Sequence, residues 1–298
     1  MAAQPLYLID ASIYIFRAYF AMPDEWFSPE GYSVNALNGY TQFLLKFLQQ
    51  VKPQKIAIAY DESLGSCFRN DIYPEYKASR VLPDEELAFQ LQACKALTEI
   101  MGIPTFASHR YEADDIIATL AHSAQQRGDS VTIVSRDKDL GQILKNPDDI
   151  LWDYAADKRI TTGNFIKHYT VESHQMTDFL ALIGDPIDDI PGVPGIGKKT
   201  AAALLGQFGS LENIYNDLAA VANSGLRGAK GIADKLLDHR SQIEMAQALV
   251  RLEYNVAELA KASVDWQPAS KDTVAFFLDE YALMRRFQRQ LDNCYWWK

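Results

Sequence analysis

Short apolar runs alternate with helical patterns through the first half of the chain. The runs are rich in Ile, Val and Tyr and occupy residues 7–9, 56–60 and 131–134. The segments between them carry apolar residues at helical spacing, at 36–51, 84–101 and 112–127. Runs that are apolar throughout predict strands buried on both faces, and their alternation with helices predicts a mainly parallel central sheet covered by helices. The pattern therefore predicts the α/β fold class.

Each predicted strand runs into acidic residues. The acids that follow the three runs are Asp10, Asp61, Asp137 and Asp139. Ligands of an open parallel sheet bind beyond the carboxyl ends of its strands, so these carboxylates are expected at one edge. The helix pattern at 112–127 begins with Glu112 and places Asp115 three residues on. Acids in the first turn also interact favourably with the helix dipole, and for this pair alone that role would suffice.

So many carboxylates cannot all ionise in one pocket without cations. No histidine or cysteine stands in these motifs, and oxygen-only ligation suits Mg²⁺ or Mn²⁺ rather than zinc. Two such ions about 4 Å apart are a common arrangement in nucleases and phosphatases. The pattern indicates metal-dependent hydrolysis of a phosphate ester.

After about residue 157 short helical patterns separated by Gly and Pro replace the strands, and we place a boundary near residue 170. Residues 184–201 nearly match a phosphate-binding P-loop, but Lys199 stands where Ser or Thr is required and no strand precedes the glycines. A helix-hairpin-helix fits better, with helices at 177–183 and from Lys198 on. The N–H groups at that second helix start, with Lys198 and Lys199, can hold a DNA phosphate. An ordinary Gly/Pro turn remains the alternative.

Cations interleave with aromatic residues in the segment 68–80. It contains Arg69, Lys77 and Arg80 together with Tyr73 and Tyr76. This mixture suits a nucleic-acid strand through phosphate pairing and base stacking, and the spacing of Lys77 and Arg80 would place both on one helical face. A solvated polar segment is an equal alternative.

The end of the chain is aromatic. Residues 271–291 predict one helix, and the side chains that follow it either dock on the core or contact a partner, with docking favoured: Tyr295, Trp296 and Trp297.

Composition limits the other possibilities. Three widely spaced cysteines without a CxxC pair argue against a disulfide framework or a cysteine zinc site, and a reduced cytoplasm is the expected location. No apolar run of about 18 residues exists, so no membrane span is expected. The net charge of -10 argues at first sight against a nucleic-acid partner.

Taken together, the motifs resemble the 5′-nuclease family, that is, the flap endonucleases and the 5′→3′ exonuclease domain of bacterial DNA polymerase I. The resemblance covers about residues 6–287 and rests on Asp10 with IYIFRAYFA, on Asp61, and on YPEYKASR, YEADD, SRDKD and GDPIDDIPGVPGIGKKTA. It implies a PIN-like nuclease core at 1–170 with a helical arch or clamp at about 66–100. It also implies a helical helix-hairpin-helix region at 171–298.

The resemblance also implies roles for single residues. The implied metal ligands are Asp10, Asp61, Glu112, Asp114, Asp115, Asp137, Asp139, Asp185 and Asp188. Tyr76 would stack on the DNA end, while Lys77 and Arg80 would steer and stabilise the scissile phosphate. The implied DNA contacts are Arg17, Arg69, Gly195, Gly197, Lys198, Lys199 and Thr200. The backbone carbonyls implied to hold a monovalent cation such as K⁺ are those of Pro191, Val193 and Ile196.

The function implied is a 5′→3′ exonuclease and flap endonuclease that uses two Mg²⁺ or Mn²⁺ ions. It would act as a monomer on DNA with 5′ ends, flaps or branched junctions and leave a 5′-phosphate and a 3′-hydroxyl. Because no polymerase module follows before the sequence stops, a stand-alone enzyme is expected. Asp189, Asn35 and the pair Ser135-Arg136 differ from the residues usual in the family at their positions.

Two other functions compete with this one. A DNA-junction binder with a decayed site would have no use for so many acids, and a small-phosphoester hydrolase would not need the hairpin. The acidity itself agrees with a metal site, because without the nine implied ligands 30 of the 39 acidic residues remain against 29 basic ones.

Overall fold

The structure is a computed structural model and describes residues 5–297, so the predicted domain limits at residues 1 and 298 lie outside it. Two compact units make up the chain. The sheet unit comprises the residues up to Glu62, Leu82–Arg136 and the chain from Tyr254 on. The helical unit comprises Ser63–Val81 and Asp137–Glu253. Each unit is thus built from separate stretches of sequence, and the predicted division at residue 170, which concerns chain order, stays a prediction.

Four parallel strands form the centre of the sheet unit. Their spatial order is β3-β2-β1-β4, and their bounds are β1 Leu6–Asp10, β2 Ile56–Asp61, β3 Thr105–Ser108 and β4 Val131–Val134. β1, β2 and β4 are almost wholly buried, as their apolar sequences predict. The predicted fold class is confirmed. β3 was not predicted, because it is a short edge strand of half-exposed residues without an apolar run.

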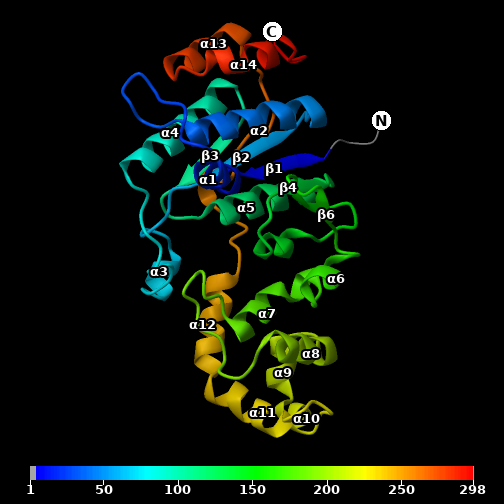
Figure 1. The fold of residues 1–298 in the computed structure, drawn as a ribbon. Helices are drawn as coiled ribbons and strands as arrows, with labels where there is room; N and C mark the ends of the chain where they lie inside the picture. Colours follow the sequence, from blue (N-terminus) through cyan, green and yellow to red (C-terminus); the bar gives the residue numbers. More distant parts are fainter. Residues whose placement is uncertain (1–4, 298) are drawn as a thin grey trace. The chain divides into compact units, whose positions relative to one another are not determined.

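Helices cover both faces of this sheet (Figure 1). Three of them pack near the sheet, with α2 (Asn35–Val51) and α4 (Glu85–Ile100) on one face and α5 (Ala113–Gln126) on the other. α1 (Ala11–Ala21) follows β1 directly and packs on α2, and η3 (Ala257–Leu259) packs on α5. The three helices predicted from periodicity are confirmed to within two residues at each end. Asp84 caps α4 by accepting the N–H of Leu87 at 2.8 Å.

The C-terminal segment is two helices, not the single helix predicted for 271–291. α13 (Lys271–Glu280) and α14 (Met284–Asp292) are separated by a turn in which Ala282 takes a left-handed φ of 57°. The turn lets Leu278 and Phe287 both face the core, whereas Phe276 is exposed. Uniform helical spacing in the sequence hid this break.

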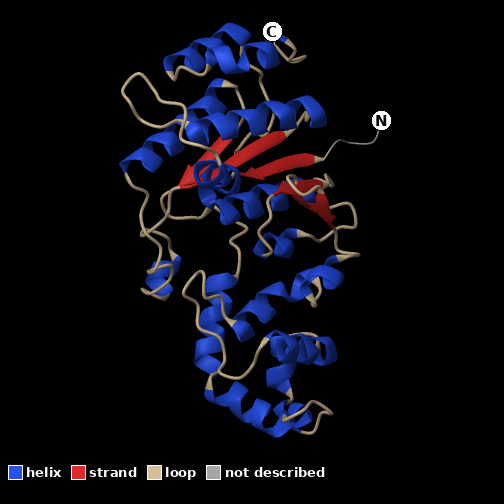
Figure 2. Ribbon diagram, in the orientation of Figure 1, coloured by secondary structure: helices blue, strands red, loops and turns tan. Residues whose placement is uncertain are grey.

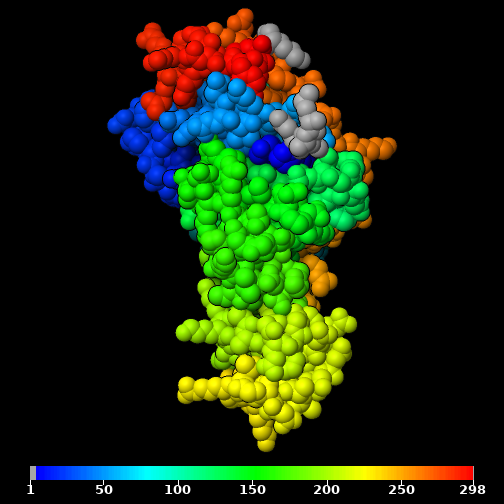
Figure 3. Space-filling view, turned by 90° about the vertical axis from the view of Figure 1, so that its right-hand side faces the viewer, coloured from blue at the N-terminus to red at the C-terminus, as the bar shows by residue number. Residues whose placement is uncertain are grey.

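The aromatic end docks on its own unit. The ring of Trp296 is buried, and its centroid lies 5.6 Å from that of Trp266. The Trp297 Nε1–H donates to the Leu291 carbonyl at 2.6 Å. In the space-filling view the red C-terminal surface lies against the light-blue surface of α2 (Figure 3). Docking, the favoured prediction, is what the structure shows for the two tryptophans, whereas Tyr295 is 49% exposed.

The strands of the helical unit are β5 (Ile150–Asp153) and β6 (Lys158–Ile160), which pair antiparallel (Figure 2). Its helices are α3 (Arg69–Ile72), η1 (Asp139–Ile143), α6 (Phe165–Tyr169), η2 (Ser173–Gln175), α7 (Met176–Ile183), α8 (Lys198–Phe208), α9 (Leu211–Asn216), α10 (Leu218–Ala222), α11 (Ala229–Asp238) and α12 (Arg240–Val250). α7 packs on α12 and on α8, which gives the predicted hairpin a helical frame.

Among the described residues, no helix combines the length and the apolar character needed to span a membrane.

Candidate metal centre and phosphate clamp

The acids of the sheet unit stand where the sequence placed them, at the ends of strands and at a helix start. Asp10 ends β1 and is buried; its Oδ1 accepts the Ser12 N–H at 3.1 Å and its Oδ2 accepts the buried Ser135 hydroxyl at 3.2 Å. Asp61 ends the neighbouring strand β2 and is exposed. Asp10 is thus an N-cap of α1 with its orientation fixed by two donors, while the same strand edge presents Asp61 to solvent.

Glu112 and Asp115 cap α5. They form a capping box in which the Asp115 carboxylate accepts the Glu112 N–H at 3.1 Å, and Asp115 is fully buried. The structural role weighed from the sequence is therefore present. Their role as metal ligands, like that of the half-exposed Asp114, stays a prediction.

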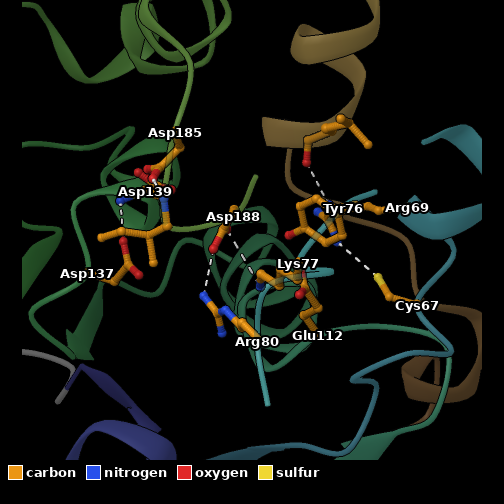
Figure 4. Close-up of polar contacts among 12 residues, drawn as sticks. Cys67, Arg69, Tyr76, Lys77, Arg80, Glu112, Asp137, Asp139, Asp185 and Asp188 are labelled. Carbon is orange, nitrogen blue, oxygen red and sulfur yellow. Dashed lines mark hydrogen bonds and ion pairs between the residues drawn. The ribbon is translucent and has the colours of Figure 1, made fainter. Parts of the chain in front are cut away.

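The acids of the helical unit gather around a lysine that the sequence analysis did not single out. The Lys138 ammonium lies 2.8 Å from Oδ2 of Asp185 and 3.1 Å from Oδ1 of Asp139 (Figure 4 shows the two acids). Asp137 accepts the Asp139 N–H at 2.8 Å, and Asp185 accepts the Ile187 N–H at 3.0 Å. The signal for Lys138 was its place between two predicted ligands in the motif SRDKD.

The negative charge of this acidic cluster is only partly neutralised by Lys138. Burial raises the pKa of Asp139 to about 7, and the charge of Asp137 adds to the shift, which Lys138 only partly offsets. Burial works against the charge of Lys138, but its acidic neighbours, Asp139 and Asp185 above all, outweigh this and raise its pKa. Oδ1 of Asp139 is buried and, among the residues described, has the Lys138 ammonium beside it but accepts no further hydrogen bond. Such a buried carboxylate oxygen is suited to act as a ligand of a cation.

These oxygen donors fit a hard divalent ion, with the Lys138 ammonium standing in for part of its charge. Within residues 5–297, however, no three His, Cys, Asp or Glu side chains are arranged to hold a metal as they stand. A divalent ion at Asp139 and Asp185 therefore has to displace the lysine.

Lys77 and Arg80 converge on one carboxylate of the hairpin. Nζ of Lys77 lies 3.6 Å from Oδ2 of Asp188, and Nη2 of Arg80 lies 2.6 Å from its Oδ1 (Figure 4). The shared helical face predicted for them is wrong, because residues 74–79 form turns and Lys77 takes a left-handed φ of 54°. Tyr76 is only 4% exposed, so its predicted stacking on DNA requires the ring to become accessible.

Arg69 is a structural residue, and its prediction as a DNA contact is wrong. Its side chain is 2% exposed, its Nε donates to the Leu249 carbonyl at 2.6 Å, and its Nη2 donates to the Arg251 carbonyl at 2.9 Å. It thus satisfies carbonyls at the C-terminal end of α12, where a cation also interacts favourably with the helix dipole. The sequence showed a cation beside aromatics but not the distant carbonyls that bind it.

Two glycines of the hairpin, Gly184 and Gly192, allow two segments of the backbone to lie very close to each other. A Cβ on Gly184 would meet the Gly192 nitrogen at 2.4 Å, and one on Gly192 would meet the Ile183 oxygen at 2.1 Å. Backbone bonds in both directions between Asp185 and Ile190 close this loop. The sequence requirement for glycine here is therefore steric.

The start of α8 is open to solvent. Gly197 is its N-cap and makes no side-chain cap, while Lys198 and Lys199 are exposed in the first turn and Thr200 is half-buried. Lys235 of α11, which no sequence signal indicated, adds a third cation. Its Nζ lies so close to Gly195 that a Cβ added to this glycine would be 2.3 Å from it. Arg17 is exposed on α1.

The carbonyls predicted to hold K⁺ already accept hydrogen bonds in part. Gln242 Nε2 donates to the Pro191 carbonyl at 3.4 Å and to the Gly192 carbonyl at 2.9 Å. The Val193 carbonyl accepts the Ile196 N–H at 2.9 Å. A monovalent cation would use the remaining lone pairs of these oxygens, and this site stays a prediction.

Asp139→Asn should stabilise the metal-free protein. Folding raises the pKa of this carboxyl. Such a group lowers the free energy of unfolding progressively as the pH rises from its pKa in the unfolded chain to its pKa in the folded one, and the full loss of stability is present above the folded pKa. In EDTA we expect the Tm of the variant to exceed that of wild type by several degrees at about pH 8 and by much less at about pH 5.

The control is Asp148→Asn, which changes an exposed acid of the same unit. Added Mg²⁺ should raise the Tm of wild type more than that of Asp139→Asn. An Asp139→Asn variant less stable than wild type at pH 8 in EDTA would contradict the charge imbalance.

Known protein families match almost the whole chain. Residues 5–171 match the family described as 5′-3′ exonuclease, N-terminal resolvase-like domain, and residues 171–272 match 5′-3′ exonuclease, C-terminal SAM fold. The 5′-3′ exonuclease of Buchnera aphidicola subsp. Schizaphis graminum is 33% identical over 254 residues, which are 85% of this chain and 88% of that protein. DNA polymerase I of Rhizobium leguminosarum is 35% identical over 258 residues, 84% of this chain but 25% of that protein. The chain thus spans about a quarter of the length of its DNA polymerase I relatives.

Solved structures agree on the fold. The bacteriophage T5 5′-exonuclease with bound zinc has a TM-score of 0.69 at 19% identity, covering 94% of this chain and 99% of that one. The T5 flap endonuclease in a complex with DNA and metal ions has a TM-score of 0.66 at 20% identity, covering 94% and 100%. With both halves matched and a relative similar over most of its length, this chain belongs to the 5′-3′ exonuclease family of enzymes.

Proposed function

We propose that this chain is a divalent-metal-dependent 5′→3′ exonuclease and structure-specific flap endonuclease on DNA. It hydrolyses phosphodiesters near 5′ ends and leaves a 5′-phosphate and a 3′-hydroxyl. The observation that carries the proposal is the surplus of negative charge at Asp139 and Asp185, for which Lys138 supplies one ammonium. Relatives of similar length that are named 5′-3′ exonuclease support the reaction class.

The proposed ligands of two Mg²⁺ or Mn²⁺ ions are Asp10, Asp61, Glu112, Asp114, Asp115, Asp137, Asp139, Asp185 and Asp188. Two bound ions supply an activated water and a positive charge for the leaving oxygen. The chain prepares several of these carboxylates in advance. Two donors orient Asp10, and a backbone N–H orients each of Asp137 and Asp185, so their oxygens lose little freedom when they bind a ligand.

Lys77 and Arg80 are proposed to contact the phosphate that is cut. Both cations now lie on the two oxygens of one carboxylate, and a phosphate presents a similar pair of charged acceptors. Their charge stabilises the negative charge that grows on the phosphate in the transition state. Tyr76 is proposed to stack on the DNA end once its ring is exposed.

The hairpin is proposed to hold the DNA backbone away from the reacting phosphate. The open N–H groups at the start of α8 and the exposed Lys198 and Lys199 suit a phosphate oxygen, with Gly195, Gly197 and Thr200 forming the surrounding surface. Lys235 and, on the other unit, Arg17 are further candidate phosphate contacts. A K⁺ ion at the carbonyls of Pro191, Val193 and Ile196 would add positive charge to the same loop.

The proposed partners are DNA molecules with 5′ ends, flaps or branched junctions, and the complex of the T5 flap endonuclease with DNA supports a DNA partner. We propose that the protein acts as a monomer in the cytoplasm. The three cysteines, none of which is in a disulfide among the described residues, agree with a reducing compartment.

Cleavage of a 5′-labelled flap duplex tests this function. In Mg²⁺ the wild type should release short labelled products from near the junction, and EDTA should abolish them. Asp137→Asn should slow cleavage about 100-fold or more, because a ligand charge is lost while the side-chain shape is kept. No cleavage by the wild type, or equal rates for the two proteins, would contradict the proposal. Hydrolysis of nucleotide monophosphates without cleavage of DNA would instead favour a small-phosphoester hydrolase.

Lys77→Ala should lower turnover far more than binding. One phosphate contact among several contributes little to affinity, whereas a charge at the reacting phosphate acts in the transition state. Single-turnover rates should fall about 100-fold, and the Kd for DNA measured in Ca²⁺ should change less than about threefold. Lys261→Ala, at an exposed lysine of the sheet unit, is the control and should leave both values unchanged. Equal losses in rate and affinity would contradict the role.

A further inference from the structure

The turn that carries Lys77 and Arg80 is fastened to the hairpin at two adjacent acids. At Asp188 the attachment is partly ionic, through Lys77 and Arg80, and partly through the backbone, where the Lys77 N–H donates to the Asp188 carbonyl at 3.1 Å. At Asp189 the attachment runs through Ser79, whose N–H donates to the Asp189 carboxylate at 2.8 Å. All of these residues belong to the helical unit.

The two acids differ in what can compete for them. The carboxylate of Asp188 binds two side-chain cations, and it is also a proposed metal ligand, so an arriving divalent ion competes with Lys77 and Arg80 for the same oxygens. The carboxylate of Asp189 binds an uncharged backbone N–H, which no metal replaces. The contact at Asp189 can therefore persist when the ion pairs at Asp188 are exchanged.

The geometry of Asp189 fits a built contact. Its backbone takes a left-handed φ of 57°, a conformation that aspartate and asparagine tolerate better than other residues apart from glycine, and this turn directs the carboxylate toward the N–H of Ser79. The hydrogen bond from Ser79 lowers the pKa of Asp189, which keeps the acceptor charged.

We propose that Asp189 is a positioning residue that keeps the turn of Lys77, Ser79 and Arg80 docked on the hairpin while the Asp188 carboxylate is free to change partners. Through this contact the two cations stay beside the proposed metal ligands after they leave Asp188. The consequence for catalysis rests on the proposed function, but the docking itself does not.

Limited digestion with trypsin measures the docking directly. Trypsin cuts after Lys77 and after Arg80, and it reaches these two peptide bonds when the turn has detached from the hairpin. The rates of cutting at these two bonds are followed by mass spectrometry in EDTA and in MgCl₂. Asp189→Ala should raise both rates about tenfold in each condition, the effect of losing one charge-assisted hydrogen bond.

Asp189→Asn is the conservative variant, since it keeps an acceptor oxygen and tolerates the left-handed backbone. Its rates should stay within about threefold of wild type. Asp148→Ala, at an exposed acid of the same unit, should behave as wild type. Circular dichroism and the Tm show whether each variant is folded. If Asp189→Ala is not folded, the docking is tested instead by comparing Asp189→Asn with the double variant Asp188→Asn/Asp189→Asn in MgCl₂. The double variant should then be cut no faster than Asp189→Asn, because Mg²⁺ has already taken Asp188.

Flap cleavage by the same proteins separates positioning from general stability. Asp189→Ala should lower kcat about tenfold with KM within about twofold, and Asp189→Asn should restore most of the rate. Cutting by trypsin at the wild-type rate in Asp189→Ala would overturn the proposal whatever the nuclease result. Faster cutting in a protein whose wild type cleaves no DNA would instead leave the docking in place and refute the proposed function.

Discussion

Repulsion between carboxylates that the fold holds close together is the constraint on which the rest of the candidate site depends. Asp139 and Asp185 share one ammonium, that of Lys138, and the pKa of Asp139 rises to about 7 as a result of burial and of its acidic neighbours, Asp137 among them. Asp188 in turn is neutralised by Lys77 and Arg80. In this structure the chain's own cations occupy the places that metal ions and a phosphate are proposed to take. Metal binding is then an exchange of partners, and each exchange releases a lysine or an arginine.

Rigid elements of the fold hold these acidic groups in position. In the sheet unit, a buried parallel strand delivers Asp10 to the start of α1, where the helix N–H and Ser135 fix it. In the helical unit, the close passage of Gly184 and Gly192 determines where Asp185 lies. Backbone geometry therefore places these acids.

The sequence predicted those parts of the fold and site that depend on local pattern. Apolar runs identified β1, β2 and β4, and spacing identified α2, α4 and α5, because burial on one or both faces leaves a regular trace in the sequence. The parts it missed depend on distant partners. Nothing near Arg69 indicates the carbonyls of Leu249 and Arg251, and Lys235 reaches Gly195 only through the folding of α11. The break at Ala282 and the turns around Lys77 interrupt spacing that is otherwise helical, so the sequence favoured continuous helices there.

Counting the divalent ions that bind tests the account most directly. Electron paramagnetic resonance of free Mn²⁺, titrated with metal-free protein, gives the number of bound ions without any DNA or activity. The account predicts two ions per chain, with at least one lost in Asp139→Asn. An absence of saturable binding at millimolar Mn²⁺, or two ions bound equally by wild type and Asp139→Asn, would contradict it.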